Sequence, residues 1–235
     1  MLKFQQNWSL NMKKYFEVLR KCSLFDAISD DYLPAMLTCF GVTIKTYEKD
    51  ETIVSEGTPA RYLGIVLSGE AQILRIDYYG NRSIMANLAP SQLFGESYAC
   101  AELESVPVDI VATKKTEIMM IDVHKITRPC ANSCEFHKQM IFNLVKAVAM
   151  QNLVYHQKIE ITSKRNTRDK LITYLTTEAK NHGSTSFTVP YDRQELADYL
   201  EVERSGLSTE IGKLRREGIL ECEKNRFTLL AGFPH

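Results

Sequence analysis

The sequence predicts an α+β protein built from an N-terminal β-roll (a double-stranded β-helix, or jelly roll), a long central helix and a C-terminal winged helix. Three observations support this class. Short β-type runs recur between glycines over 41–121. One helical apolar pattern covers 134–162. A helix, a strand, two helices joined by a tight turn, and a hairpin follow. The expected domains are 1–132, 133–163 and 164–235.

The composition is that of a globular protein. Of 235 residues, 44% are hydrophobic and 25% are charged, and the formal net charge is zero. Any attraction to nucleic acid must therefore be local. No apolar run approaches the roughly 18 residues of a membrane span, and the N-terminus lacks a signal-peptide pattern, which favours a cytoplasmic protein without a membrane partner. The six cysteines are irregularly spaced, so we expect reduced thiols.

The β-roll prediction rests on strand-like runs that follow a helical stretch over 13–40. Enrichment in Ile, Val, Tyr and Thr favours strands, and Tyr79-Gly80-Asn81 is a predicted hairpin turn. A roll of this kind usually encloses a cavity suited to a small ligand. The predicted strands are VTIKTY, TIV, YLGIVL, AQILRIDYY, RSIMANL, DIVAT and EIMMID.

The central segment predicts one helix long enough to extend past the roll. Apolar residues from Phe136 to Ile159 recur at intervals of three and four. At 1.5 Å per residue the helix would span roughly 40 Å. We therefore expect pairing with a second copy through 134–162, a homodimer contact. The alternative is burial of the same stripe against the chain's own roll.

The last segment predicts two helices, 193–200 and 204–216, joined by a tight turn. Asp192 and Glu195 form a capping-box pattern, and Lys224-Asn225 is a predicted wing turn. The span 204–216 holds four basic residues against Glu210 alone. Its outer face is donor-rich, as a helix that enters a DNA major groove requires. Such helix pairs also occur in proteins that never bind DNA. The outer-face residues are Arg204, Ser205, Ser208, Thr209, Lys213 and Arg216.

Two residues are unusual for this motif. Glu201 occupies the turn position, where a positive φ would cost about 1 kcal/mol for a residue other than glycine. Gly206 lies inside the second helix and weakens it by about 1 kcal/mol relative to alanine.

The chain resembles the Crp/Fnr superfamily of bacterial transcription regulators over nearly its whole length. The resemblance implies a non-enzymatic homodimer that binds a near-palindromic operator on double-stranded DNA, under control of an effector sensed in the roll. It also raises RNA polymerase as a candidate partner. The segments that carry the resemblance are SEGTPARYLGIVLSGEAQILRID, the FGE at Phe94–Glu96, the long helix and DRQELADYLEVERSGLS.

The resemblance assigns roles to residues of the helix pair. Base edges would be read by Arg204, Ser205, Ser208 and Thr209, and Arg204 can bind guanine in bidentate fashion. The residues better placed for phosphates are Arg193, Gln194 and Lys213.

The predicted effector pocket departs from that of the cyclic-AMP binders. Those relatives carry an Arg-Ser or Arg-Ala pair where this chain has Val106 and Pro107, and no Arg or Lys lies between Phe94 and Val111. An anion needs a fixed cation, so we predict an unidentified small effector other than cyclic AMP. No cofactor is identified. The candidate pocket residues are Phe94, Gly95, Glu96, Ser97, Val106, Pro107, Tyr155 and His156.

Three other interpretations of the chain are considered. Cys130, Cys134 and His137 could make a redox- or metal-responsive regulator, because Cys134 and His137 share a helix face. A cupin-like enzyme would need histidines inside the roll, and none lies between Gly41 and Asp122. A third reading, a winged helix that binds protein, keeps the same fold.

Overall fold

The computed structural model describes residues 12–80, 82–128 and 135–230. The chain forms two compact units. One comprises Met1–Ile76 and Ala86–Gln151, and the other comprises Asp77–Met85 and Asn152–His235. No helix of the described residues is long and apolar enough to cross a membrane.

Short helical segments open the first unit, which confirms the helical prediction for 13–40. Their apolar side chains share one buried core with Met140 and Leu144 of the long helix. Asn143 of that helix is fully buried, and its Nδ2 donates to the carbonyls of Leu24 and Asp26, each at 2.9 Å. The segments are η1 (Lys13–Tyr15), α2 (Phe16–Arg20), η2 (Ser23–Phe25) and α3 (Leu33–Phe40).

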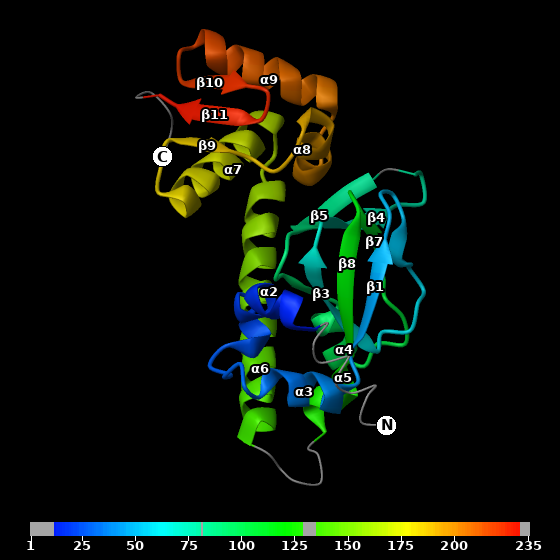
Figure 1. Cartoon of the computed structure of the whole chain (residues 1–235). Helices are drawn as coiled ribbons and strands as arrows, with labels where there is room; N and C mark the ends of the chain where they lie inside the picture. The colour runs from blue at the N-terminus through cyan, green and yellow to red at the C-terminus, as the bar shows by residue number, and fades with distance from the viewer. Residues whose placement is uncertain (1–11, 81, 129–134, 231–235) are drawn as a thin grey trace. The chain divides into compact units, whose positions relative to one another are not determined.

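Within the described residues, eight strands form the roll as two four-stranded sheets (Figure 1). The first sheet has the order β1 (Thr43–Tyr47), β8 (Thr116–Asp122), β3 (Tyr62–Ser68) and β6 (Leu93–Phe94). The second has the order β2 (Thr52–Val54), β7 (Asp109–Ala112), β4 (Ala71–Ile76) and β5 (Arg82–Leu88).

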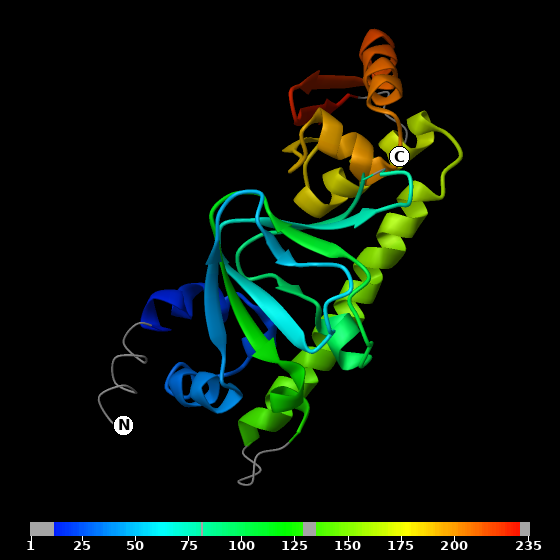
Figure 2. The same cartoon turned by 90° about the vertical axis from the view of Figure 1, so that its right-hand side faces the viewer.

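The predicted strands of the roll are confirmed, with three of them shorter than predicted: VTIKTY and DIVAT by one residue each and AQILRIDYY by three. The run AQILRIDYY ends as a strand at Ile76, and Gly80 then adopts φ 82 in the turn, with its N–H donating to the Asp77 carbonyl at 3.0 Å. Asn81 lies outside the described residues. Buried side chains such as Ile65, Met119 and Ile121 fill the core between the strands, and Figure 2 shows the strands wrapping around it.

Among the described residues, α4 (Glu96–Cys100) follows β6, α5 (Val123–Thr127) follows β8, and the 28-residue long helix α6 (Glu135–Thr162) comes after α5. The predicted single long helix is therefore confirmed over the described residues.

The second unit contains a winged helix, as predicted. Its three-stranded sheet has the order β10-β11-β9, and the Lys224-Asn225 turn joins β10 to β11. A core of Leu171, Leu196, Leu207 and Phe227 is fully buried beneath it. The elements are α7 (Thr167–His182), β9 (Ser186–Thr188), α8 (Arg193–Leu200), α9 (Arg204–Arg216), β10 (Leu220–Glu223) and β11 (Arg226–Leu229).

Candidate nucleic-acid interface and candidate sensor site

The start of α8 is fixed by a reciprocal cap, as the sequence predicts. The Glu195 N–H donates to Asp192 Oδ1 at 2.8 Å, and the Asp192 N–H donates to Glu195 Oε2 at 2.9 Å. Two backbone N–H groups at this helix end are satisfied locally, so the orientation of α8 is set where it leaves the preceding loop.

The turn between α8 and α9 has the strained geometry expected at Glu201. This residue has φ 54, in the left-handed region, and the next N–H, that of Val202, donates to the Ala197 carbonyl at 3.0 Å. One left-handed residue therefore reverses the chain. Leu200 and Leu207, on either side of the turn, are fully buried.

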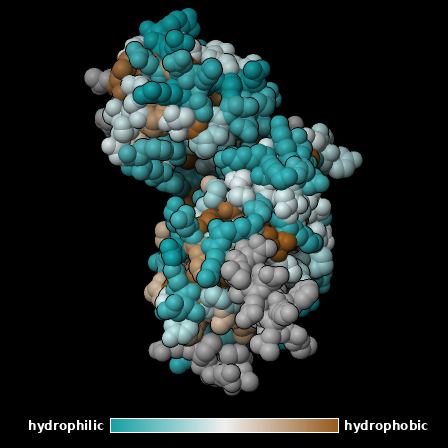
Figure 3. Space-filling view, viewed as in Figure 1, coloured by the Kyte–Doolittle hydropathy of each residue, from teal (hydrophilic) through white to brown (hydrophobic). Residues whose placement is uncertain are grey.

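The predicted outer face of α9 is exposed along its whole length. Arg204, Ser205, Ser208, Thr209 and Lys213 are all exposed. The opposite face is buried, and the surface over α9 is predominantly hydrophilic (Figure 3). The helix therefore presents one polar face to solvent and one apolar face to its own domain.

The polar side chains on this face of α9 differ in whether they already form hydrogen bonds or ion pairs within the protein. Thr209 Oγ1 donates to the Ser205 carbonyl at 2.9 Å, so its methyl group and lone pairs stay available. Lys213 Nζ is 2.5 Å from Glu210 Oε1. Within the part of the chain that the structure describes, Arg204 makes no hydrogen bond or ion pair, which leaves its guanidinium available for a ligand.

Arg193 and Gln194, the expected phosphate contacts, are engaged within the protein. Arg193 Nη2 donates to the Lys224 carbonyl at 3.2 Å and to Cys222 Sγ at 3.3 Å, so this half-buried side chain ties α8 to the wing. Gln194 is exposed, and its Nε2 donates to Asp198 Oδ1 at 2.8 Å. Their role at phosphates stays a prediction.

Sequence reasoning missed a group of residues at the start of α7. A hollow of about 590 Å³ lies between this end of α7 and the outer face of α9. The Asn166 side chain caps α7 by accepting from the Asp169 N–H at 2.8 Å, and the Asn-x-x-Asp spacing is the signal that points to it. The hollow is lined by Asn166, Thr167, Arg168, Ser205, Gly206, Thr209, Glu210 and Lys213.

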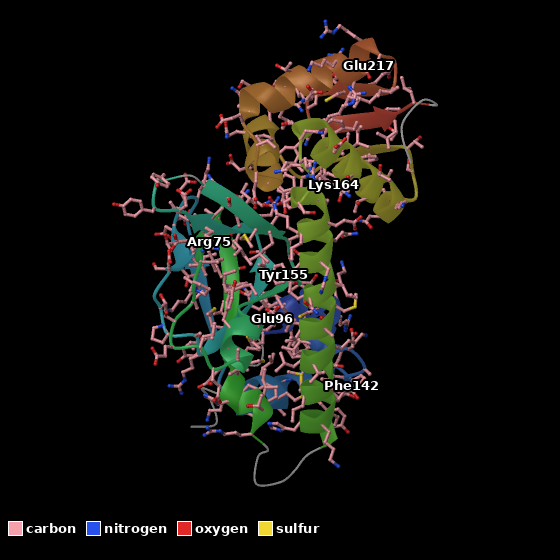
Figure 4. All side chains as sticks on the ribbon, turned by 180° about the vertical axis from the view of Figure 1, so that it is seen from behind. Arg75, Glu96, Phe142, Tyr155, Lys164 and Glu217 are labelled. Atoms are coloured by element: carbon pink, nitrogen blue, oxygen red, sulfur yellow. The ribbon has the colours of Figure 1, made fainter. Side chains whose placement is uncertain are left out.

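Arg168 also neutralises an acidic residue at the end of α9. Its guanidinium binds Glu217 through both terminal nitrogens, at 2.9 and 2.5 Å, and these hydrogen bonds lower the pKa of the Glu217 carboxyl (labelled in Figure 4). The repulsion between Glu217 and a phosphate backbone is reduced accordingly.

In the first unit, the Phe94–Ser97 segment joins β6 to α4. Gly95 has φ 77, which glycine adopts at little cost, and a Cβ built on Gly64 would lie 2.0 Å from the Phe94 ring. The buried Phe94 ring therefore lies directly on the backbone of β3. Ser97 is half-buried in the first turn of α4.

Glu96 is the most unusual group of this segment. It is 3% exposed, and its Oε2 has no hydrogen-bond partner among the described residues. Burial raises the pKa of its carboxyl above the ordinary value of 4.5. A buried acid without a counter-charge favours its neutral form.

The remaining predicted pocket residues occupy different environments. Val106 is buried and pairs with a neighbouring loop: its N–H donates to the Thr58 carbonyl at 2.8 Å, and its carbonyl accepts from the Gly57 N–H at 2.9 Å. Pro107 is exposed. Tyr155, half-buried, and His156, exposed, belong to the part of α6 in the second unit.

The proposed metal or redox group falls partly outside the described residues, because Cys130 and Cys134 are not among them. His137 is buried, with its Nε2 3.1 Å from the Lys125 carbonyl and its ring edge-to-face on Phe40. Among the residues that the structure does describe, no group of three or more His, Cys, Asp or Glu could hold a metal ion.

Comparison with known proteins matches both halves of the architecture. Residues 44–133 match the cyclic nucleotide-binding domain, and residues 169–231 match the Crp-like helix-turn-helix domain. A sensor-type roll joined to this DNA-binding domain defines a transcription regulator. The chain belongs to the Crp/Fnr family of transcriptional regulators, as its resemblance predicts.

Curated relatives and solved structures agree with this assignment. The transcriptional activator FnrL of Cereibacter sphaeroides is 20% identical over 80% of this chain and 77% of its own, and the global nitrogen regulator of Nostoc sp. is 19% identical over 81% and 86%. The same fold occurs in FixK2 from Bradyrhizobium japonicum (TM-score 0.61, 21% identity, 80% of this chain and 92% of that one). It also occurs in the c-di-GMP responsive regulator CLP of Xanthomonas campestris (TM-score 0.68, 16% identity, 84% and 99%).

The burial of Glu96 makes a prediction about pH and stability. Its pKa is raised by folding, so the free energy of unfolding should fall as pH rises from 4.5 through the folded pKa, where the carboxyl must ionise inside the protein. Glu96→Gln keeps the shape and stays neutral. We expect its gain in stability over the native chain to be absent at about pH 4 and to grow toward pH 8.

The matched control is Glu117→Gln in β8. Burial alone would raise the pKa of Glu117, but hydrogen bonds from Tyr15, Ser68 and Lys14 lower it. This variant should lose stability relative to the native chain at neutral pH, and the loss should disappear in acid. Urea unfolding of both variants across this pH range tests the assignment, and a Glu96→Gln effect that does not vary with pH would contradict it.

Proposed function

We propose that this regulator works as a homodimer whose two α9 helices read a near-palindromic DNA operator, under control of a small effector other than cyclic AMP held in the roll. The observation that carries the proposal is the exposed, donor-rich face of α9 opposite a buried apolar seam. RNA polymerase, implied by the family, is a further proposed partner, and the cytoplasm is the proposed location. No enzymatic activity is proposed.

Local charge supports the DNA contact. The net charge of the whole chain is zero, yet 204–216 holds four basic residues against Glu210. Glu210 is paired with Lys213, and Glu217 is paired with Arg168. With these two carboxylates engaged, the basic side chains Arg204, Arg215 and Arg216 are offset on α9 mainly by Glu203 at its N-terminus. Specificity then rests on the available Arg204 guanidinium more than on overall charge.

The surface of α6 supports the dimer. Phe142, Val145 and Leu153 are 63%, 64% and 60% exposed in the single chain, although the opposite face of the helix is buried in the core (Phe142 is labelled in Figure 4). Burying an apolar side chain of this size contributes about 1.5–3 kcal/mol. Several such residues on one helix favour coverage by a partner, and a second copy supplies the same stripe.

The dimer also gives the operator its geometry. A two-fold axis along α6 would relate the two α9 helices, which would then enter successive major grooves about 34 Å apart. The operator half-sites should therefore be inverted repeats.

The chemistry of the roll supports an uncharged effector. No Arg or Lys lies between Phe94 and Val111. The backbone N–H and carbonyl of Val106 are already hydrogen-bonded to the neighbouring loop, and Glu96 is a buried acid. A cyclic phosphate would meet no fixed cation in this segment. A neutral molecule with a hydrogen-bond donor would instead satisfy the unpartnered Glu96 Oε2.

Substitution of Arg204 tests the DNA contact. Arg204→Ala should lower the preference for one base pair in each half-site by about 1–3 kcal/mol, because it removes a bidentate contact to guanine. The measurement is competition binding of the preferred duplex against duplexes mutated at each position.

Lys213→Ala is the matched control for Arg204→Ala. A phosphate contact should weaken binding to every duplex alike and lower the salt dependence by about one charge. The assignment of Arg204 to base reading fails if its variant shows this uniform pattern instead.

Substitution of Phe142 tests the dimer. Phe142→Glu should convert the protein to monomer in sedimentation velocity at micromolar concentration, because it places a charge in an apolar helix contact. Tyr78→Glu is the control, since Tyr78 is 97% exposed outside α6. A Phe142→Glu protein that still sediments as a dimer would show that α6 is not the dimer contact.

A further inference from the structure

Lys158, near the end of α6, is a buried lysine that contacts the first helix of the helix-turn-helix. It is 5% exposed, and its Nζ donates to the carbonyl of Tyr199 in α8 and lies 3.6 Å from the centroid of the Tyr199 ring. A second carbonyl, that of Ile84, is 3.3 Å away. These residues all belong to the second compact unit.

The end of α8 explains why a lysine is needed there. A helix leaves its last carbonyls without intrahelical donors. The Ala197 and Asp198 carbonyls accept from the N–H groups of Val202 and Glu201, at 3.0 and 3.4 Å. The next carbonyls have no such donor within the turn.

Two lysines take the remaining carbonyls. Lys170 of α7 donates to the carbonyls of Leu200 and Glu201 at 3.2 and 3.1 Å, and Lys158 of α6 takes that of Tyr199. Both ammonium groups lie at the negative end of the α8 dipole. The end of α8 is therefore held by one lysine from within the DNA-binding domain and one from the long helix.

The position of Lys158 is costly, which argues that it is specific. Burial lowers the pKa of its ammonium to about 8, against the attraction of Glu201 and together with the repulsion of Lys170. The Tyr199 ring beneath it is itself stacked on Tyr191 at 4.7 Å, so the cation rests on a fixed aromatic surface. A lysine side chain that merely passed along the surface would keep its ammonium in water.

We propose that Lys158 is a latch that fixes α8, and with it the recognition helix α9, to the long helix α6. The buried seam and the one-residue turn at Glu201 bind α8 and α9 to each other, so α9 cannot reorient unless α8 moves. While Lys158 is seated, the direction of α6 sets the direction of α9. When it is released, α8 loses this contact with α6 and α9 samples other orientations.

The latch gives the proposed dimer a means of control. Two α9 helices can engage one operator only if both keep the same orientation relative to α6. Seating Lys158 in both copies pre-organises them for DNA. An event that shifts α6 relative to α8 would lower DNA affinity without touching α9 itself. This consequence rests on the proposed DNA-binding function, whereas the latch itself does not.

The test compares three substitutions in the full chain. Lys158→Met keeps the length of the side chain but removes the donor and the charge, and Lys158→Gln is a second variant that removes the charge and shortens the side chain. Lys170→Met is the matched control, because it removes a donor to the same helix end from within the DNA-binding domain. The distance between spin labels on genetically encoded residues at the exposed positions Asn152 and Arg215 reports the orientation of α9 relative to α6.

A single narrow distance distribution is expected for the native chain and for Lys170→Met, and a broad one for both Lys158 variants. Distributions as narrow as the native one in whichever Lys158 variants fold would overturn the latch. Operator affinity should fall on the order of tenfold in these variants, the usual size of such coupling.

The label distances separate the latch from the proposed function. If the native chain binds no DNA and the spin-label distances of the Lys158 variants are broadly distributed, the proposed function is refuted and the latch is supported. If the native chain binds its operator and the distance distributions of the Lys158 variants are unchanged, the proposed function is supported and the latch is refuted.

Discussion

Between α8 and α9 the chain reverses through one left-handed residue, Glu201 at φ 54, and the DNA-binding surface depends on this turn. Such a conformation costs a residue other than glycine about 1 kcal/mol. The cost is offset around the turn, where the Val202 N–H satisfies the Ala197 carbonyl and two lysines hold the carbonyls that follow. Leu200 and Leu207 are buried on either side of the turn, so the two helices pack as one unit.

The helix α6 has one face buried in its own unit and a second apolar face that is exposed. Met140, Asn143 and Leu144 are buried, and Asn143 joins the helix to the N-terminal segments through two hydrogen bonds. Phe142 and Val145, on the other side, are left exposed. A helix that packs only within its own domain does not need a second apolar face. The exposed apolar residues of α6 therefore favour contact with a second copy of the chain.

Much of this architecture follows from local patterns in the sequence. The bounds of α8 and α9 follow from the Asp192–Glu195 cap and the spacing of apolar residues, and the strands of the roll follow from their β-branched residues. The two-residue strand β6 was missed, because so short a run carries no periodicity. The hollow beside α9 was missed because three of its eight lining residues come from the start of α7, about 40 residues earlier in the chain.

Contacts between distant residues explain the other differences. Arg193 looks like a free surface arginine in sequence, yet the wing, which lies 29 to 31 residues later, holds its guanidinium. In the sequence, Lys158 is one polar residue of a long helix, and it is buried by contacts with α8 and with Ile84, which lie far from it in the chain. Glu96 belongs to a familiar motif, but its unpartnered oxygen depends on the packing of the roll around it. Propensity and spacing say nothing of such partners, which arise only from the tertiary fold.

We propose that two copies of the chain read DNA together through α9. Selection of bound duplexes from a random library with the native protein tests it most directly. We expect an inverted repeat whose half-site centres lie about one helical turn, roughly 10 base pairs, apart. A single motif without an inverted copy, or no enrichment over random duplexes, would contradict it.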